Sequence, residues 1–190
     1  MKTIVYLHGF ISSPQSKKAV MLGAYLANCV TGVQYRVPEL HHRPARAMEQ
    51  VQAACAGIPV DDLTLVGSSL GGFYATVVAE QLGCRAALLN PAVRPHTHLE
   101  PHLGPQRNLY TGEEFVFGPE HVAELAALQP ARITRPERFW LFVETGDVVC
   151  DYREAVDFYR GALHTVVTGG DHTLASFPEQ VPELVEWAKS

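Results

Sequence analysis

The sequence predicts an α/β protein built on a mainly parallel, six-stranded sheet with helices on both faces. Short apolar runs rich in β-branched residues alternate with helix-like segments, and this order builds a parallel sheet through right-handed crossovers. The 190 residues are 47% hydrophobic, which is enough for one core, and they show no internal repeat. We therefore expect residues 1–190 to form a single domain.

The first half of the chain contains four of the expected strands, each a short run of β-branched, aromatic or aliphatic residues. Pro38 ends the second strand, and Gly57 with Pro59 ends the second helix. Ser13 or Ser16 is placed to cap the first helix. The expected strands cover residues 3–7, 32–37, 63–66 and 85–89, and the expected helices cover residues 16–28, 44–56 and 73–82.

The alternation of strands and helices breaks between Pro91 and Pro136. This stretch is rich in Pro, His and Gly, and it is too long for an ordinary connection between a strand and a helix. We expect a cap-like insertion, at about residues 91–136, over the catalytic edge of the sheet, with one clear helix at 120–128. The pattern then resumes with strands at 139–143 and 162–167 and helices at 152–160 and 178–189.

The third strand runs into Gly67-Ser68-Ser69-Leu70-Gly71, a G-x-S-x-G pattern, and a helix follows at once. Strand, G-x-S-x-G and helix in this order form the nucleophile elbow of α/β-hydrolases, a sharp turn that projects the serine hydroxyl from the sheet. The residues two before and two after that serine have no room for a Cβ atom, which favours glycine at both positions. Only Ser69 meets this condition, since Ser68 has Val66 and Leu70 there. We therefore predict the α/β-hydrolase fold with Ser69 as the nucleophile.

The acid and the base of such a site follow the serine along the chain, in that order. The acid is expected just beyond the fifth strand, where Glu144, Asp147 and Asp151 are candidates. We choose Asp147, because Asp151 is placed to cap the helix that begins at Tyr152. His172 is the only histidine after the last strand. It would take the proton of the nucleophile, while Asp147 orients the imidazole and stabilises its charged form.

The oxyanion hole of this fold takes one N–H from the residue after the nucleophile, which is Leu70, and one from a loop after an early strand. The loop after the first strand is His8-Gly9-Phe10, and the N–H of Phe10 is the expected second donor. For His8 itself, a structural hydrogen bond within the loop is expected in place of a catalytic role.

Composition excludes several classes of function. The net charge of -5 and the absence of any basic run longer than Lys17-Lys18 argue against nucleic acid binding. No stretch approaches the ~20 apolar residues of a membrane span. Lys2 leads straight into a strand, so we expect no signal peptide and a cytoplasmic location. The sequence does not indicate an oligomeric state.

Neither the cysteines nor the histidines have the spacing of metal ligands. Cys29, Cys55 and Cys84 are far apart along the chain and are expected to be reduced thiols, and Cys150, near the predicted acid, is expected to fill space. The remaining candidate histidines lack ordered spacing with acids or cysteines, so we expect no metal and no cofactor. These are His41, His42, His96, His98 and His102.

Six groups of motifs are spread along nearly the whole chain, including the insertion. They are Ile4–Phe10 with Ser12-Ser13-Pro14 and Ser16-Lys17, Gly67–Ala75, Asn90–Pro95, Asn108-x-Tyr110-Thr111-Gly112-Glu113, Thr145-Gly146-Asp147 with Asp151-Tyr152-Arg153, and Gly169–His172. Together they resemble the motifs of YqiA-type esterases. The resemblance implies a small α/β-hydrolase with esterase activity and a Ser69–Asp147–His172 triad, and it does not fix a physiological substrate. One position departs from the pattern: Val148 follows Asp147, where the family usually has Glu.

These observations predict a serine esterase that cleaves carboxylic ester or acyl thioester bonds of a small molecule through an acyl-enzyme. The insertion should set substrate choice, and Arg94 within it would either meet an acidic group of the substrate or form a structural salt bridge. The alternatives are a thioesterase or a C–C bond hydrolase with the same triad, or a non-catalytic binding protein that keeps the fold.

Overall fold

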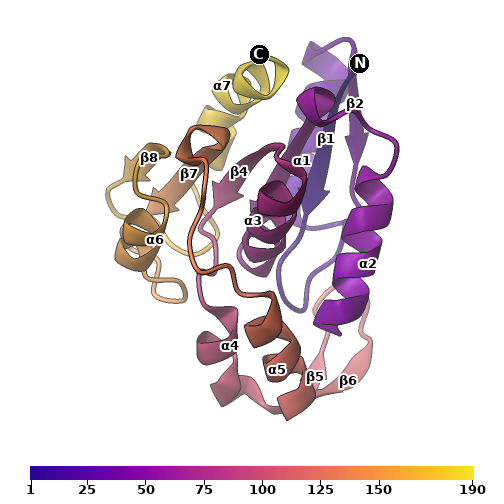
Figure 1. The fold of residues 1–190 in the computed structure, drawn as a ribbon, viewed down its shortest axis with the longest axis vertical. Helices are drawn as coiled ribbons and strands as arrows, with labels where there is room; N and C mark the ends of the chain where they lie inside the picture. Colours follow the sequence, from indigo (N-terminus) through magenta and orange to yellow (C-terminus); the bar gives the residue numbers. More distant parts are fainter.

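The computed structural model describes residues 1–190 and contains a six-stranded sheet in the order β2-β1-β3-β4-β7-β8 (Figure 1). Every pair of neighbouring strands is parallel. The predicted fold class is therefore confirmed, and no antiparallel strand enters this sheet. The strands are β1 Lys2–Leu7, β2 Val33–Arg36, β3 Leu63–Ser68, β4 Arg85–Leu89, β7 Phe139–Glu144 and β8 Leu163–Val167.

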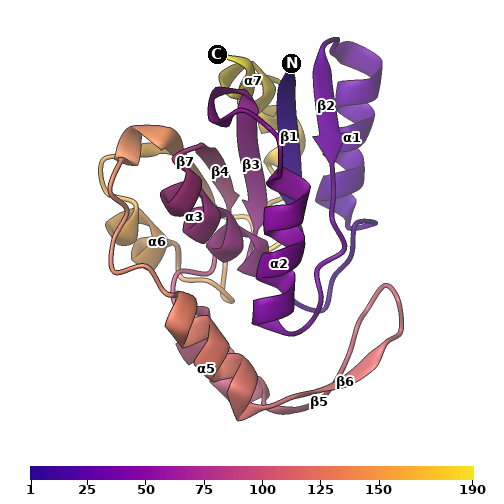
Figure 2. The ribbon, with the colours of Figure 1, turned by 45° about the vertical axis from the view of Figure 1, so that its right-hand side comes forward.

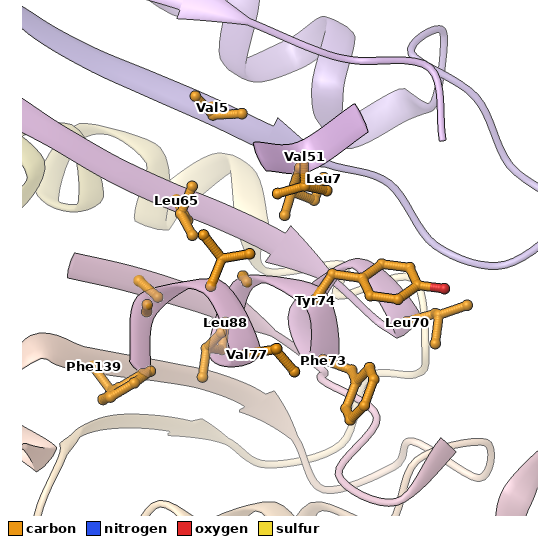
Figure 3. Close-up of a cluster of buried hydrophobic side chains, with 14 of the residues drawn as sticks. Val5, Leu7, Val51, Leu65, Leu70, Phe73, Tyr74, Val77, Leu88 and Phe139 are labelled. Carbon is orange, nitrogen blue, oxygen red and sulfur yellow. The ribbon is translucent and has the colours of Figure 1, made fainter. Parts of the chain in front are cut away.

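Helices cover both faces of the sheet, as its continuous apolar strands require. Successive strand residues point to opposite faces, so Leu65 packs toward α2, α3 and α6, whereas Val66 packs toward α1 and α7. Figure 3 shows residues of the first of these two cores, among them Val51 of α2, Leu65 of β3 and Val77 of α3. The helices are α1 Lys17–Cys29, α2 Pro44–Cys55, α3 Leu70–Leu82, α6 Tyr152–Phe158 and α7 Phe177–Lys189. None of the helices is both long enough and apolar enough to span a bilayer.

The insertion lies beyond the carboxyl ends of the strands, at the end of the molecule opposite both termini (Figures 1 and 2). It contains the expected helix as α5 Pro119–Leu128. It also contains two elements that the sequence did not predict, a short helix α4 Pro95–His98 and an antiparallel hairpin of β5 Gly104–Arg107 with β6 Glu114–Phe117. Three 3₁₀ turns, Val60–Asp62, Glu100–His102 and Pro136–Arg138, complete the fold.

Polar contacts connect the insertion to the residues at the start of α2. Arg43 forms an ion pair with Glu124 of α5, and Glu124 also accepts a hydrogen bond from the Ala45 N–H at 3.0 Å. His42 Nδ1 and His121 Nε2 lie 3.0 Å apart. The insertion is thus anchored by side chains of α5 at the start of α2.

Candidate active site

The G-x-S-x-G segment forms a strained turn between β3 and α3. Ser69 has a φ of 54°, in the left-handed region that side chains rarely adopt. A Cβ atom on Gly67 would overlap the Gly71 carbonyl, and one on Gly71 would overlap the Leu7 carbonyl. Glycine is therefore required two residues before and two residues after Ser69, which explains both glycines of the G-x-S-x-G motif.

Ser69, His172 and Asp147 meet at the carboxyl edge of the sheet. His172 Nε2 lies 3.1 Å from Ser69 Oγ, and His172 Nδ1 lies 2.7 Å from Asp147 Oδ2. Because the carboxylate is an acceptor only, Nδ1 carries the proton and Nε2 is free to accept from the serine hydroxyl. The structure thus brings the three predicted side chains together in one hydrogen-bonded chain.

Asp147 is held in its ionised form. Its other oxygen, Oδ1, accepts hydrogen bonds from the N–H groups of Val149 at 2.8 Å and Cys150 at 2.9 Å. Burial favours the neutral acid, but the hydrogen bonds from His172 and from these two amides outweigh it and lower the pKa of Asp147. Asp151, the rejected candidate, accepts the Arg153 N–H at 2.9 Å and caps α6, as expected.

The loop that carries His172 is fixed by two residues whose roles the sequence analysis missed. Glu144 is buried and accepts the N–H of Asp171 at 2.7 Å and both the N–H and the hydroxyl of Ser176. Burial opposes its charge, yet these hydrogen bonds together lower the pKa of Glu144. Asn90 donates to the Asp171 carbonyl at 2.9 Å and accepts from the Glu144 N–H at 3.0 Å.

The signal for these two residues was present in the sequence. Glu144 is an acid at the last position of a buried strand, and Asn90 follows another strand at the same edge. Polar side chains in such positions face the loops that gather there, although the sequence does not say which loop they hold.

The loop after β1 lies against Ser69, and Gly9, Phe10 and Ser69 line one cavity. A Cβ atom on Gly9 would lie 3.3 Å from the Ser69 Cβ, so this loop and the nucleophile are in close contact. The Phe10 N–H makes no hydrogen bond within the protein, and the Leu70 N–H opens α3 without an intrahelical acceptor. Both predicted oxyanion donors are therefore free at this edge.

The hairpin of the insertion supports the same loop. Asn108 Nδ2 donates to the Ser12 carbonyl at 2.8 Å, and the Leu109 N–H donates to the Ile11 carbonyl at 3.2 Å. The ring of Phe10 packs edge-on against Phe117, with centroids 5.2 Å apart. The insertion thus holds the candidate oxyanion loop from outside the sheet.

His8 has the structural role expected for it. Its Nε2 accepts the Leu40 N–H at 3.1 Å, so its Nδ1 carries the proton and faces the Gly9 carbonyl, also at 3.1 Å. Burial lowers the pKa of His8, which favours this neutral form.

A cavity of about 600 Å³ opens beside Ser69 and His172. Arg94 is not among its lining residues: its guanidinium lies 3.3 Å from Glu154, whose other oxygen lies 3.3 Å from His98. Of the two roles considered for Arg94, the salt bridge is the one that the structure shows. The lining also includes residues that the sequence analysis did not connect with the site, among them Lys17, Lys18, Met21, Leu174 and Phe177.

One group of side chains has the composition of a metal site. The ligand atoms of Asp147, Cys150 and His172 lie within 4.8 Å of one another. However, Asp147 and His172 already pair with each other. Burial, with the nearby charge of Asp147, raises the pKa of the Cys150 thiol to about 12, so it stays protonated and is a poor ligand. The residues fit a proton relay better than a metal centre.

Solved structures resemble this chain over nearly its full length. Est1E from Butyrivibrio proteoclasticus, solved with ferulic acid, has a TM-score of 0.72 at 16% identity, covering 100% of this chain and 90% of that chain. Alpha/beta hydrolase domain-containing protein 10 from mouse has a TM-score of 0.72 at 15% identity, covering 97% of this chain and 90% of that chain. The esterase domain of a Rhodothermus marinus protein has a TM-score of 0.66 at 19% identity, covering 99% of this chain and 86% of that chain. At these identities the likeness establishes the α/β-hydrolase fold.

The sequence relatives point to one family. A UPF0227 protein of Klebsiella pneumoniae (strain 342) is 30% identical over 99 residues, which are 51% of this chain and 54% of that protein. The aligned part therefore spans about half the length of this curated relative. The model of the family described as "Uncharacterised protein family (UPF0227)" matches residues 3–189, and the chain therefore belongs to this family.

Proposed function

We propose that this protein is a serine hydrolase that cleaves carboxylic ester or acyl thioester bonds of small molecules. The observation that carries the proposal is the chain of hydrogen bonds from Asp147 through His172 to Ser69, with distances of 2.7 and 3.1 Å. A hydroxyl that donates to a neutral imidazole, itself oriented by a buried carboxylate, is the arrangement that activates serine for acyl transfer.

In the first half of the reaction, Ser69 Oγ attacks the carbonyl carbon and its proton passes to His172 Nε2. Asp147 stabilises the imidazolium that forms. The carbonyl oxygen becomes an oxyanion, which accepts hydrogen bonds from the N–H groups of Phe10 and Leu70. The bond to the leaving oxygen or sulfur then breaks, His172 returns the proton to that atom, and an acyl-Ser69 ester remains.

In the second half, water attacks the acyl carbon while His172 Nε2 accepts its proton. The oxyanion forms again between the same two N–H groups. Its collapse breaks the bond to Ser69 Oγ, which takes the proton back from His172 and leaves the carboxylic acid. Every proton moves through His172 Nε2.

Two further features support an ester substrate. The N–H groups of Phe10 and Leu70 have no acceptor in the protein, and Asn108 holds the loop of Phe10 through the Ser12 carbonyl, which suits a charge that develops only during the reaction. Among the proteins of the same fold, the Rhodothermus marinus domain is described as an esterase.

Labelling by a fluorophosphonate probe tests the proposal, because such probes form a covalent bond with the activated serine of serine hydrolases. The wild-type protein should label stoichiometrically, and Ser69→Ala should not. Ser68→Ala is the matched control, since Ser68 adjoins the nucleophile but makes no hydrogen bond with His172, and it should still label. A wild-type protein that resists the probe would favour a non-catalytic binding protein.

A substrate panel then separates the enzymatic alternatives. Aryl esters, acyl thioesters and a vinylogous 1,5-diketone, as a C–C bond substrate, should be compared by kcat/KM. Turnover of the esters or thioesters, lost in Ser69→Ala, supports the proposal. Turnover of the diketone alone would replace it with a C–C bond hydrolase.

A further inference from the structure

The loop of the insertion hairpin contains a motif that no step of the proposed mechanism uses, Asn108-x-Tyr110-Thr111-Gly112-Glu113. It joins β5 to β6 and closes on itself. The Asn108 N–H donates to the Glu113 carbonyl at 2.8 Å, and the Gly112 N–H donates to the Asn108 carbonyl at 3.0 Å. Gly112 has a φ of 75°, which glycine adopts without strain. The motif therefore forms a tight loop that fixes the backbone of Asn108.

The side chain of Asn108 is fixed by the same loop. Its Oδ1 accepts the N–H groups of Tyr110 at 2.9 Å and Thr111 at 3.0 Å. These bonds form a side-chain turn typical of asparagine, and they identify the amide oxygen, so the other end of the amide is the NH₂ group. This NH₂ group donates to the Ser12 carbonyl at 2.8 Å, to a residue 96 positions earlier in the chain. The loop thus directs one donor at the segment that follows β1.

The hairpin makes all the hydrogen bonds of Ile11 and Ser12. The Leu109 N–H donates to the Ile11 carbonyl at 3.2 Å, and Asn108 Nδ2 donates to Ser12. No other hydrogen bond reaches either residue. Ile11 and Ser12 directly follow Phe10, whose N–H is the proposed oxyanion donor. The chain just after this donor is therefore hydrogen-bonded to the insertion and to nothing else.

Ile11 has a strained backbone conformation. Its φ is 47°, in the left-handed region that β-branched residues rarely adopt. Such a conformation persists only where surrounding contacts hold it, and it is common at catalytic sites. Without the bonds from Asn108 and Leu109, Ile11 would relax toward a negative φ, and the chain from Phe10 to Ser12 would take another path. The hairpin thus keeps this loop in a shape that its own sequence does not favour.

We propose that Asn108 is a positioning residue for the oxyanion hole. Its bond to Ser12 holds Ile11 in the strained conformation and thereby fixes the Phe10 N–H where negative charge develops on the carbonyl oxygen. This inference rests on the proposed hydrolase function. It makes the insertion a part of the catalytic machinery, because the insertion supports an oxyanion donor in addition to covering the catalytic edge.

Two substitutions of Asn108 test this role. Asn108→Asp keeps the acceptor for Tyr110 and Thr111 but faces the Ser12 carbonyl with an oxygen, and Asn108→Ala removes the donor without adding charge. Both should lower kcat and kcat/KM on an aryl ester by about ten- to a hundredfold, as expected for a misplaced oxyanion donor. KM should stay within about twofold, because this N–H acts mainly on the transition state. Circular dichroism checks the fold.

Glu124→Gln is the matched control within the insertion. It removes the ion pair between α5 and Arg43, which loosens the attachment of the insertion to α2 without touching the hairpin loop. Its kcat should stay within about twofold of wild type, since exposed ion pairs contribute little. An equal loss in Glu124→Gln and in the Asn108 variants would assign the effect to a loosened insertion and overturn the proposal. Full activity in both Asn108 variants would overturn it as well.

A trifluoromethyl ketone inhibitor reports on the oxyanion hole itself. Ser69 Oγ adds to its carbonyl carbon, the serine proton passes to His172 Nε2, and the carbonyl oxygen becomes an oxyanion that remains bound. Its inhibition constant should rise in each Asn108 variant by the same factor as kcat/KM falls, as for any transition-state analogue. A lower kcat with an unchanged inhibition constant would place the loss outside the oxyanion hole and overturn the proposal.

The amide signals of Phe10, Ile11 and Ser12 keep this result separate from the hydrolase proposal. In isotopically labelled Asn108→Asp these signals should shift and their hydrogen exchange should accelerate, whereas Glu124→Gln should leave them unchanged. Unchanged signals in Asn108→Asp would overturn the role of Asn108 whether or not the protein cleaves esters. A wild-type protein that neither labels with a fluorophosphonate nor cleaves esters would overturn the hydrolase, and shifted signals would still support the hold of Asn108 on the loop.

Discussion

His172 Nδ1 lies 2.7 Å from Asp147 Oδ2, although the two residues follow different strands of the sheet. This contact fixes the tautomer of His172 and therefore which nitrogen faces Ser69. Asp147→Asn would let the amide donate to Nδ1 and turn the imidazole to the wrong tautomer.

The first prediction is that Asp147→Asn reduces kcat by about 10³- to 10⁴-fold while the fold is kept. Steady-state hydrolysis of an aryl ester measures the loss, and circular dichroism checks the fold. Asp151→Asn is the matched control four residues away. Asp151 contacts the first turn of α6, where it accepts the Arg153 N–H and pairs with the Arg153 guanidinium. The activity of Asp151→Asn should therefore stay within about twofold of wild type, with at most about 1 kcal/mol of stability lost. Equal loss in both variants would contradict the role of Asp147.

The second prediction concerns Glu144, which holds the loop of His172 by accepting from Asp171 and Ser176. Glu144→Gln would face these donors with an amide NH₂. It should lower the free energy of unfolding by about 2 kcal/mol or more, as expected for losing buried hydrogen bonds to a charged group. Glu144→Gln should also lower kcat, since the loop of His172 would no longer hold the imidazole at hydrogen-bonding distance from Ser69 and Asp147. Chemical denaturation and ester hydrolysis measure the two effects.

The pH dependence of this loss follows from the lowered pKa of Glu144 in the folded protein. A lowered pKa contributes stability that is present above the unfolded value, about 4.3, and is lost as pH falls through the folded value. The stability difference between wild type and Glu144→Gln should therefore be full at neutral pH and shrink below about pH 4. A difference that stays constant down to pH 3 would exclude an ionised Glu144.

The third prediction concerns the elbow. Gly71→Ala would place a Cβ atom against the Leu7 carbonyl, in backbone that cannot move without shifting β1. We expect a protein that either does not fold or has no measurable labelling at Ser69. Gly32→Ala is the control: Gly32 also has a positive φ, of 74°, but its Cβ would meet nothing within 4 Å. It should cost only about 1 kcal/mol, the conformational strain, and retain labelling.

The strands and the turn around Ser69 were predictable because their signals are local. The run Thr3–Leu7 is β-branched and aromatic, and the glycines around Ser69 are demanded by backbone overlap within a single turn. Gly170 extends this reasoning, since a side chain there would collide with Glu144. The sequence shows that a glycine stands at this position, but Glu144, which leaves no room for a side chain there, is 26 residues earlier, and their contact is known only from the folded structure.

The hairpin of the insertion could not be predicted in the same way. Its first strand is Gly104-Pro105-Gln106-Arg107, which has neither β-branched residues nor an alternation of apolar and polar side chains. Tertiary contacts stabilise it, namely the packing of Phe10 on Phe115 and Phe117 and the bond from Asn108 to Ser12. Such contacts override the low strand propensity of the segment.

The last prediction concerns the attachment of the insertion to α2. His121 is buried, and its Nδ1 accepts the Gly118 N–H at 3.0 Å, so its Nε2 carries the proton that is donated to His42 Nδ1. Protonation of His42 at Nδ1 would remove the acceptor of this bond, and protonation of His121 at Nδ1 would remove the acceptor of the Gly118 N–H. Protonation of both rings would bring two positive charges together. Arg43 and His41 add to this repulsion, while the carboxylates of Glu113, Glu120 and Glu124 reduce it.

Burial is the main cause that lowers the pKa of His42 and of His121, and the neighbouring positive groups add to it. When folding lowers the pKa of a histidine, its neutral ring stabilises the folded contact. This stabilisation is complete above the ordinary pKa of about 6.5, and it is lost as pH falls toward the pKa of the folded state. Hydrogen exchange of α5, corrected for intrinsic rates, should therefore accelerate between pH 7.5 and pH 5.5. In His42→Phe, which keeps the ring stacked on Phe115, the protection of α5 should be lower and vary less with pH. His164→Gln, in β8 and far from α5, is the control and should retain the wild-type pH response; a response that persists equally in His42→Phe would assign it to another group.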